Sequence, residues 1–342
     1  MGIIIREGGL YTTVQDLGRI GYQDLGFSVC GAMDKNSLKI ANMLVNNKDN
    51  EACLEVTLVG PILEFTKNNI IAITGGNLQP KLNEIKVDMN KAIVVKKGDI
   101  LSFESAIDGA RSYISFSGGL DIPTIMGSKS TNVKCSIGGY NGRTLKKGDF
   151  IKFKSPKEYI PNFASKNIIN NETYGNKVIL KVILGPQDDA FTNEGLNTFL
   201  SSTYKVTKEF DRMGCRLNGP EIEHKKQADI ISDGIVLGSI QVPSHGKPII
   251  MLTDRQTTGG YTKIGTVISV DICKLAQCKT GDIINFKQIS LEEAQVLYKE
   301  EYFKFEEIRK QINKPCVEIL NPRVTSIKIE KLLIKGRLNN GI

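Results

Sequence analysis

The segment KKGDILSF at residues 96–103 has two counterparts in the chain, KKGDFIKF at 146–153 and KTGDIINF at 279–286. In each, a Lys-x-Gly-Asp stretch precedes apolar residues and a final Phe. Gly-Asp favours a tight turn, and the apolar pattern after it is typical of a strand with one buried face. Two further pairs of similar segments link the two halves of the chain, namely GPILE at 60–64 with GPEIE at 219–223 and SGGLDIP at 117–123 with TGGYTKI at 258–264. Because the spacings are unequal, a solenoid is excluded, and we predict two related β-rich domains that diverged after a duplication.

Length and composition agree with this organisation. The 342 residues exceed what one compact core usually holds, so two domains are expected. The chain contains 33 glycines and is rich in Ile, Val and Thr, which favours sheets joined by tight turns. We place the first domain at 1–160, the second at 177–290 and a C-terminal helix and tail at 291–342. The segment between the domains, 155–176, has two prolines, many asparagines and no periodicity.

Only a few helices are expected, so the predicted class is mainly β with a few helices (α+β). Helical periodicity indicates helices at 36–47, 187–202 and 290–312. Asp34 stands where an N-cap would lie, and Ser290 with Glu293 forms a capping box. The apolar run VISVD at 267–271 is typical of a strand, and 328–336 is expected to form a final strand or a docking tail.

Charge, cysteines and histidines exclude several classes of protein. The net charge is +8, but the lysines are scattered, so no nucleic-acid interface is indicated. Seven single cysteines without a CxxC motif favour reduced thiols in a cytoplasmic protein, and two histidines without metal-ligand spacing argue against a zinc site. The N-terminal apolar run is too short for a signal peptide, and no stretch approaches a membrane span.

Four polar, glycine-rich stretches are candidates for a site, at 9–34, 126–143, 209–220 and 232–265. Glycine permits close approach of a ligand, Arg binds carboxylate or phosphate, and Gln suits an amide or ureido group. Together they describe a pocket for a small planar N–C=O compound with an anion beside it. The alternative is that these stretches are turns, and that the Asp-Arg pairs at 211–212 and 254–255 are structural ion pairs.

Common catalytic and nucleotide motifs are missing from the sequence. There is no P-loop, no GxGxxG after a strand and no GxSxG elbow. There is also no Met-Lys-Met, so covalent biotin attachment to this chain is not expected. Any chemistry must therefore depend on Asp, Arg, Lys, Gln, Thr and Tyr.

These residues occur in motifs that resemble a known family from about residue 5 to about residue 300. The motifs are TTVQD at 12–16, GAMD at 31–34, DRMG at 211–214, GSIQVP at 238–243 and DRQTTGGY at 254–261. The family is the biotin-dependent carboxyltransferase-like family, whose members are also called allophanate hydrolase subunit 2, Kip-inhibitor antagonist or 5-oxoprolinase C subunit. One departure from its pattern is Lys129, where the family usually has Arg. An arginine would bind an anion through the fork of its guanidinium, whereas Lys129 offers only a point charge.

The resemblance implies two cyclophilin-like β-barrel domains in tandem. It also implies a function as the C subunit of a bacterial ATP-dependent 5-oxoprolinase, a lactam hydrolase that opens 5-oxoproline to glutamate. The implied partners are a Kip-inhibitor-type B subunit and a 5-oxoprolinase A subunit, with ATP and Mg²⁺ bound by the complex. Two alternatives stay open: the carboxyltransferase component of a urea-carboxylase-like system, and a non-catalytic regulator that binds the B subunit.

The candidate site residues come from the four polar stretches. The candidates for catalysis are Asp211, Arg212, Asp254 and Arg255. The candidates for substrate binding are Gln15, Asp16, Arg19, Asp34, Ser128, Lys129, Ser130, Arg216, Gln241, Gln256, Thr257, Thr258 and Tyr261. For Asp34, capping the helix at 36–47 is the competing interpretation.

Overall fold

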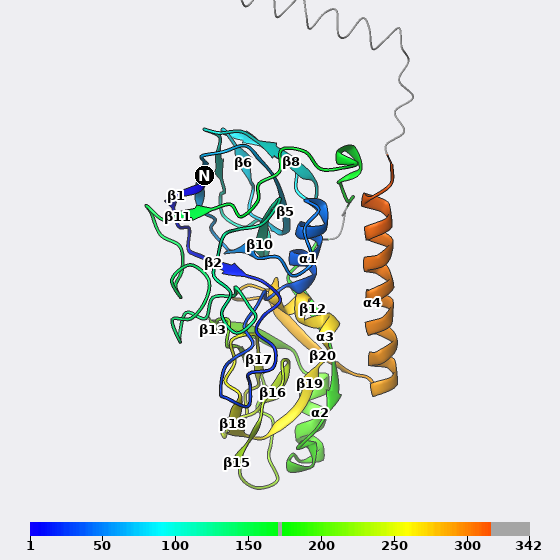
Figure 1. Ribbon diagram of the computed structural model, residues 1–342. Helices are drawn as coiled ribbons and strands as arrows, with labels where there is room; N and C mark the ends of the chain where they lie inside the picture. The colour runs from blue at the N-terminus through cyan, green and yellow to red at the C-terminus, as the bar shows by residue number, and fades with distance from the viewer. Residues whose placement is uncertain (170–172, 316–342) are drawn as a thin grey trace, which may run out of the picture.

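The computed structural model describes residues 1–169 and 173–315, and it consists of two β-rich halves with a long helix beside them (Figure 1). The strand or tail expected at 328–336 lies outside the described residues. The class predicted from the sequence, mainly β with a few helices, is confirmed.

The first half contains two facing sheets. Its strands are β1 (Gly2–Glu7), β2 (Tyr11–Gln15), β3 (Cys53–Thr57), β4 (Ile62–Phe65), β5 (Asn69–Asn77), β6 (Lys81–Leu82), β7 (Ile85–Lys86), β8 (Ala92–Val95), β9 (Ile100–Ser102), β10 (Asp108–Phe116) and β11 (Phe150–Lys152). One sheet has the order β11-β1-β4-β9-β6-β7, and the other has the order β2-β3-β10-β5-β8. Side chains from both sheets, such as Ile5, Leu63, Ile73 and Phe116, share one buried core.

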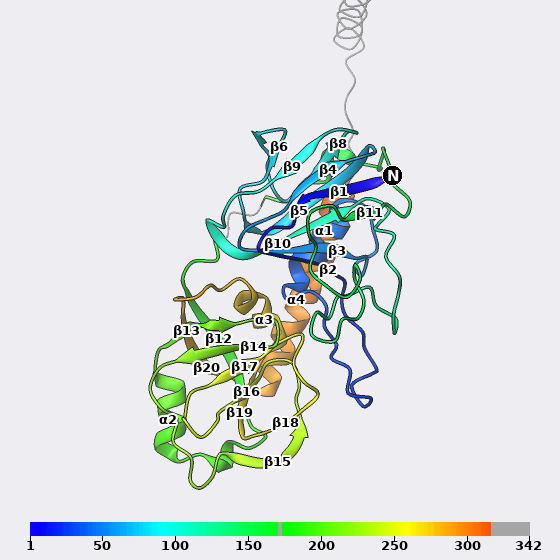
Figure 2. The same cartoon turned by 90° about the vertical axis from the view of Figure 1, so that its left-hand side faces the viewer.

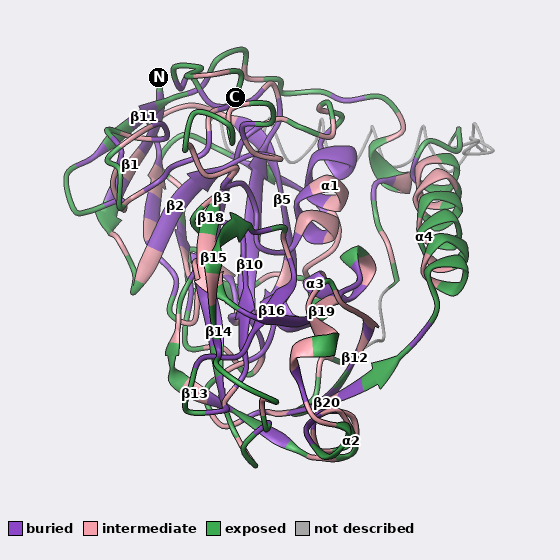
Figure 3. Cartoon of the chain, turned by 90° about the horizontal axis from the view of Figure 1, so that it is seen from below, coloured by how far each residue is buried: buried purple, intermediate pink, exposed green. Residues whose placement is uncertain are grey.

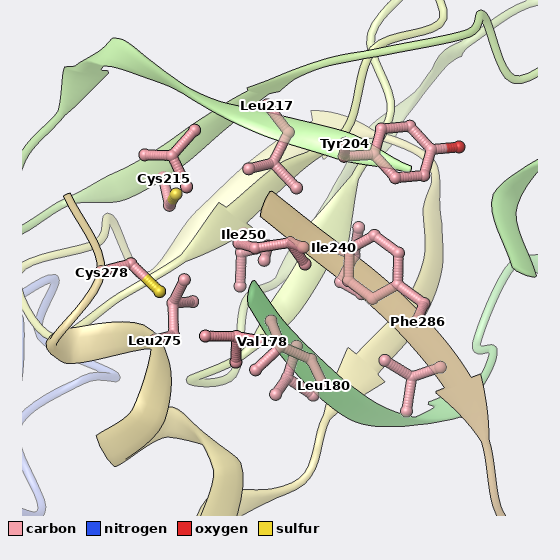
Figure 4. Close-up of a cluster of buried hydrophobic side chains, with 14 of the residues drawn as sticks. Val178, Leu180, Tyr204, Cys215, Leu217, Ile240, Ile250, Leu275, Cys278 and Phe286 are labelled. Carbon is pink, nitrogen blue, oxygen red and sulfur yellow. The ribbon is translucent and has the colours of Figure 1, made fainter. Parts of the chain in front are cut away.

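The second half closes into a barrel of seven strands, in the order β12-β19-β16-β17-β14-β13-β20. Its strands are β12 (Lys177–Leu184), β13 (Tyr204–Phe210), β14 (Gly214–Asn218), β16 (Ser239–Gln241), β17 (Ile249–Met251), β19 (Lys263–Val267) and β20 (Ile283–Gln288). Figure 4 shows its interior, which is filled by aliphatic and aromatic side chains that include Leu180, Ile240 and Phe286. Outside the barrel, β15 (Asp229–Gly234) and β18 (Thr258–Tyr261) pair with each other.

The three Lys-x-Gly-Asp segments form the same turn, as their similarity predicts. In each, the aspartate side chain accepts a hydrogen bond from the backbone N–H of the lysine three residues earlier, at 2.7 Å for Asp99, 2.8 Å for Asp149 and 2.7 Å for Asp282. The glycine adopts a positive φ of 92°, 90° and 97° in the three turns, a conformation that side chains disfavour. Each turn leads directly into a strand, which explains why the sequence repeats.

Four α-helices lie within the described residues: α1 (Lys35–Leu44), α2 (Asn193–Ser201), α3 (Ser269–Ala276) and α4 (Leu291–Ile312). Two short 3-10 turns are also present, at Phe163–Ser165 and Asp188–Ala190. The predicted cap and capping box are confirmed, because Asp34 accepts from Ser37 N and Ser290 from Glu293 N. The interpretation of 267–271 as a strand is wrong beyond Val267. The chain turns there into α3, where burial of Ile272 and Leu275 outweighs the strand preference of the β-branched residues.

Helix α4 spans both halves (Figure 1) and is largely exposed, whereas β10 is almost entirely buried (Figure 3). It leaves the barrel after β20 and reaches the first half, where Arg309 pairs with Asp49 at 2.8 Å and Glu301 accepts from Asn36 at 2.7 Å. Within the described residues, no helix is long and apolar enough to span a bilayer.

Candidate functional site

The loop between β2 and α1 descends from the first half onto the second (Figures 1 and 2). Cys30 N donates to Thr253 O at 3.0 Å, and Ser28 Oγ donates to Arg255 O at 2.7 Å. The polar stretch at 9–34 therefore lies against the stretch at 254–261. These two stretches are more than two hundred residues apart in the sequence, and their contact brings several candidate site residues to one boundary between the halves.

Arg212 is the centre of a buried ion-pair group at this boundary. Its guanidinium donates to both Asp254 oxygens at 2.9 Å and to Glu55 Oε1 at 2.5 Å. A further bond joins it to Gly31 O at 2.6 Å. Burial alone would lower the pKa of Arg212, but the charges of Asp254 and Glu55 outweigh it and raise that pKa well above its ordinary value.

The hydrogen-bond network continues from Glu55 into the first half. Glu55 Oε2 accepts from Tyr113 Oη at 2.7 Å, and Tyr113 Oη accepts from Asp34 N at 2.8 Å. Asp34 then accepts from Ser37 and from Gln277 Nε2, the latter at 2.7 Å. Because Gln277 and Arg212 belong to the second half, the network joins the two halves at two points. Buried polar groups that are this fully paired fix the relative position of the halves.

Asp16 organises a second group of predicted residues. Its Oδ1 accepts from Gly18 N, Ser128 Oγ and Ser130 Oγ at 2.8, 2.6 and 2.5 Å, and its Oδ2 accepts from Lys129 N at 2.6 Å. Four donors therefore occupy both oxygens, so Asp16 shapes the loop rather than binding a ligand directly.

Two more predicted residues lie beside this group. Arg19, which is 1% exposed, donates from Nη2 to Ser130 O at 2.5 Å, while its Nε has no partner within the described chain. Gln15 donates to Thr13 Oγ1 and Thr131 O, and its Oε1 has no partner there either. A buried polar atom without a partner is costly, so these two atoms are candidates for contact with a ligand or an ordered water.

Arg255 differs from Arg212 because it has no carboxylate partner within the described residues. Its Nε donates to Ile235 O at 3.0 Å and its Nη1 to Leu252 O at 3.2 Å. It is 6% exposed, and burial lowers its pKa below the ordinary value. An unpaired buried cation is unfavourable, so this guanidinium is suited to an anionic ligand.

Gln241 lies in the same region as Arg255. A Cβ at Gly259 would lie 2.6 Å from Ile235 Cδ1, 2.9 Å from Gln241 Nε2 and 3.6 Å from Gln256 Nε2, so all three side chains surround this glycine. Gln241 is buried and its Nε2 has no partner within the described residues. Thr257 is half-buried, and Thr258 and Tyr261 are exposed along β18. Two amide side chains therefore lie around Gly259 together with Ile235, whose carbonyl accepts from Arg255 Nε.

Several predicted residues lie outside both groups. Asp211 is exposed and accepts from the backbone N–H groups of Met213 and Gly214, so it shapes a turn. Arg216 is exposed and pairs with Glu209 at 2.9 Å. The Lys129 ammonium points away from Asp16, to Glu51 at 2.6 Å and Leu120 O at 3.1 Å. Asp34 is the cap of α1 and belongs to the network of Glu55 and Tyr113.

Sequence reasoning missed residues that the boundary also contains, above all Glu55, Tyr113, Gln277 and Lys35. Glu55 lies in β3, whose sequence is CLEVT and whose residues are almost all buried. From these five letters alone, a glutamate that faces solvent and one that is buried look the same. Lys35 is the first residue of α1, directly after its cap, and a lone lysine there carries no signal.

The boundary between the halves offers no ready-made Mg²⁺ site among the described residues. No group of three or more His, Cys, Asp or Glu with metal-binding geometry occurs among them. The buried carboxylates at the boundary are all occupied, by Arg212, by Tyr113 or by the donors around Asp16. Mg²⁺ prefers free carboxylate oxygens and water, and neither oxygen of Asp16 is free.

Comparison with known proteins identifies the class of this chain. Residues 25–288 match the carboxyltransferase domain, subdomains A and B. The chain is 38% identical over 291 residues to the C subunit of 5-oxoprolinase from Escherichia coli (strain K12), covering 85% of this chain and 92% of that protein. It is 33% identical over 315 residues to the urea amidolyase of Lachancea kluyveri, covering 86% of this chain but 17% of that protein.

Solved structures give the same result. The urea amidolyase of K. lactis superimposes with a TM-score of 0.83 at 30% identity, over 90% of this chain and 20% of that chain. The chain therefore belongs to the carboxyltransferase domain family, as its motifs predict. Its relatives within the family include proteins named as the C subunit of 5-oxoprolinase as well as parts of urea amidolyases.

Proposed function

We propose that this chain is the C subunit of an ATP-dependent 5-oxoprolinase, which opens the lactam of 5-oxoproline to glutamate together with A and B subunits. The extent of the similarity supports this proposal. The alignment covers 92% of the E. coli C subunit but only 17% of the L. kluyveri urea amidolyase, so the similarity spans nearly the whole of the separate subunit.

Two observations carry the proposal: Arg255 has no carboxylate partner among the described residues, and Gln241 Nε2, which lies with Ile235 around Gly259, has no partner there. A lactam is a planar amide, and 5-oxoproline also has a carboxylate. Gln241 and Gln256 offer donors and acceptors that match the amide, while Arg255 matches an anion. Ile235 connects the two, because its carbonyl accepts from Arg255 Nε and its side chain lies beside Gly259 with Gln241, so we infer that one small ligand with both groups would satisfy them together.

The roles of the chain's own residues follow from this geometry. Gln241 Nε2 would donate to the lactam oxygen and hold the ring, and Arg255 would stabilise negative charge beside it. Arg212 and Asp254 neutralise each other, so we assign them to positioning the 254–261 stretch rather than to chemistry. A lactam is a poor electrophile, and ATP supplies the activation. Because the boundary offers no ready-made Mg²⁺ site, we assign ATP and Mg²⁺ to the complex rather than to this chain alone.

A second candidate function is the carboxyltransferase component of a urea-carboxylase-like system. The structural match to the K. lactis urea amidolyase, with a TM-score of 0.83, favours it. Urea and the ureido ring of biotin share the N–C=O group of a lactam but lack a carboxylate. Under this proposal the carrier and the carboxylase come from other polypeptides. A regulator that only binds the B subunit stays a third proposal.

Reconstitution tests the three proposals. The chain is purified with its A and B partners, and ATP-dependent release of glutamate from 5-oxoproline is measured. In parallel, urea-dependent ATP hydrolysis is measured with the chain combined with a biotin carboxylase and a biotin carrier. Release of glutamate that needs all three subunits supports the oxoprolinase function. Turnover of urea alone would support the second candidate, and tight binding to the B subunit without turnover of either compound would support the regulator.

A further inference from the structure

The Gln241 amide lies at a tightly packed point between the barrel and the ribbon formed by β15 and β18. A Cβ on Gly259 would lie 2.9 Å from Gln241 Nε2 and 2.6 Å from Ile235 Cδ1. Non-bonded carbon atoms prefer separations of about 3.5–4.0 Å, so these two neighbours leave no room for a side chain at residue 259. The φ of Gly259 lies outside the left-handed region, so the backbone itself does not require a glycine there. The property that matters at this position is therefore the missing side chain.

A local irregularity of the barrel also lies at Gln241. Strand β16 pairs Ile240 with Gly265 but Gln241 with Lys263, so the register with β19 shifts by one residue at this point. Such shifts re-aim a side chain, and they are common beside functional sites. Gln241 is 2% exposed, and its Nε2 has no partner within the described residues. The barrel therefore places an available amide donor beside Gly259.

Ile235 connects this point to Arg255. Its side chain is buried and packs in a small cluster against β17. Its carbonyl accepts from Arg255 Nε at 3.0 Å. Ile235 is thus held by both its side chain and its backbone, whereas no hydrogen bond within the described residues holds Gln241 Nε2. A methyl group added at residue 259 would therefore displace the Gln241 amide before it displaced Ile235.

We propose that Gly259 is a positioning residue for the amide-binding part of the site. Because it has no side chain, the Gln241 amide can lie close to Ile235, the residue whose carbonyl accepts from Arg255. This inference rests on the proposed function and deepens it, since it states what fixes the donor that would hold the lactam oxygen. Gly259 acts through Gln241 and not by contact with the reacting atoms.

The test adds one methyl group to the wild-type chain. In the complex reconstituted with A and B subunits, we expect Gly259→Ala to lower kcat/KM for 5-oxoproline by about 10- to 100-fold, since a misplacement of about 1 Å can cost that much. The thermal midpoint of the purified chain should change by less than about 3 °C, because the new methyl group meets only the ends of side chains. Gly234→Ala is the matched control in the same ribbon. A Cβ there would have no atom within 4 Å, so kcat/KM should stay within about 2-fold.

A double-mutant cycle shows whether the effect passes through Gln241. Gln241→Ala should itself lower kcat/KM, and the addition of Gly259→Ala should then lower it by no more than about a further 2-fold, because the amide is already absent. Losses that multiply in the double variant would overturn the inference and leave the oxoprolinase function intact. Unchanged activity of Gly259→Ala, an equal loss for Gly234→Ala, or a much lower thermal midpoint of Gly259→Ala would overturn it as well.

Failure of the proposed function is a separate outcome. If the wild-type complex does not turn over 5-oxoproline, that function fails, and crystal structures of the wild-type chain and of Gly259→Ala decide the inference. It stands if Gln241 Nε2 moves by at least about 0.5 Å, enough to restore an ordinary contact, while the backbones of β16 and β18 stay in place. It falls if the amide does not move, or if the ribbon moves away from the barrel instead.

Discussion

Arg212 and Arg255 are equally buried, at 6% exposure each, and both follow an aspartate in the sequence, yet their surroundings are opposite. Arg212 donates to two carboxylates, Glu55 and Asp254, which come from different halves of the molecule. Arg255 donates to two backbone carbonyls and has no carboxylate within the described residues. Burial of a charged residue therefore does not by itself indicate a functional site; the missing counter-charge does.

The difference has a physical consequence for stability and for function. Removal of a paired buried arginine destabilises the protein, because its carboxylates stay buried without a partner. An unpaired buried arginine lowers the stability of the free protein, and binding of an anion offsets that loss. The two arginines should therefore respond differently to the same substitution.

Replacement of Arg212 should have the largest effect. Arg212→Met would leave Glu55 and Asp254 buried and uncompensated, and we expect a loss of about 3–5 kcal/mol in the free energy of unfolding. Chemical denaturation of the purified chain measures this. Arg216→Met is the control, because Arg216 is exposed and its pair with Glu209 should contribute less than about 1 kcal/mol. Equal small losses for both variants would show that the Arg212 group does not hold the two halves together.

Replacement of Asp34 tests the other end of the same network. Asp34→Ala removes the cap of α1 and also the acceptor for Gln277, so we expect a loss of about 2–3 kcal/mol, of which the cap alone accounts for about 1 kcal/mol. Thr192→Ala removes the cap of α2 and is the matched control. A similar loss for both would mean that the bond to Gln277 adds nothing. We expect Asp34→Ala to lower the free energy of unfolding without a comparable loss of turnover by the complex.

Local features of the fold could be predicted from the sequence because they depend on nearby residues. The Lys-x-Gly-Asp turns need only a glycine and an aspartate within four residues, and the capping box at Ser290 needs only Glu293 three residues later. The position of α3 could not be predicted, since its β-branched residues favour a strand and only packing in the barrel makes them helical.

The site was harder to predict, because its members are distant in the sequence. Of the four polar stretches, two lie in contact: 9–34 and, through residues 253–255, the stretch at 232–265. The sequence did not separate Arg212 from Arg255, because the partner that neutralises Arg212, Glu55, is 157 residues away. Only the three-dimensional arrangement shows which arginine is free to bind an anion.

Replacement of Arg255 should have a small effect on stability and a large effect on activity. Arg255→Met removes a buried charge along with two bonds to carbonyls, and the two changes oppose each other, so we expect the free energy of unfolding to change by less than about 1 kcal/mol. In the reconstituted complex, turnover of 5-oxoproline should fall by about 100-fold or more. A loss of stability as large as that of Arg212→Met would place Arg255 among the structural residues.

Replacement of Lys129 should have the smallest effect. The backbone N–H of residue 129 donates to Asp16, and a change of side chain leaves this N–H in place. The Lys129 ammonium pairs with Glu51 instead and faces away from Asp16. Lys129→Arg, which restores the usual residue of the family, should change stability by less than about 0.5 kcal/mol and leave turnover by the complex within about 2-fold.

Ser130→Ala is the contrasting variant at the next position. It removes the hydroxyl that donates to Asp16 Oδ1 and accepts from Asp16 N, and it should cost about 1–3 kcal/mol because both groups are buried. If Lys129→Arg instead raised turnover several-fold while Ser130→Ala changed nothing, the anion would bind on the Lys129 side of the loop. The contrast between the paired and the unpaired arginine would then no longer locate the site.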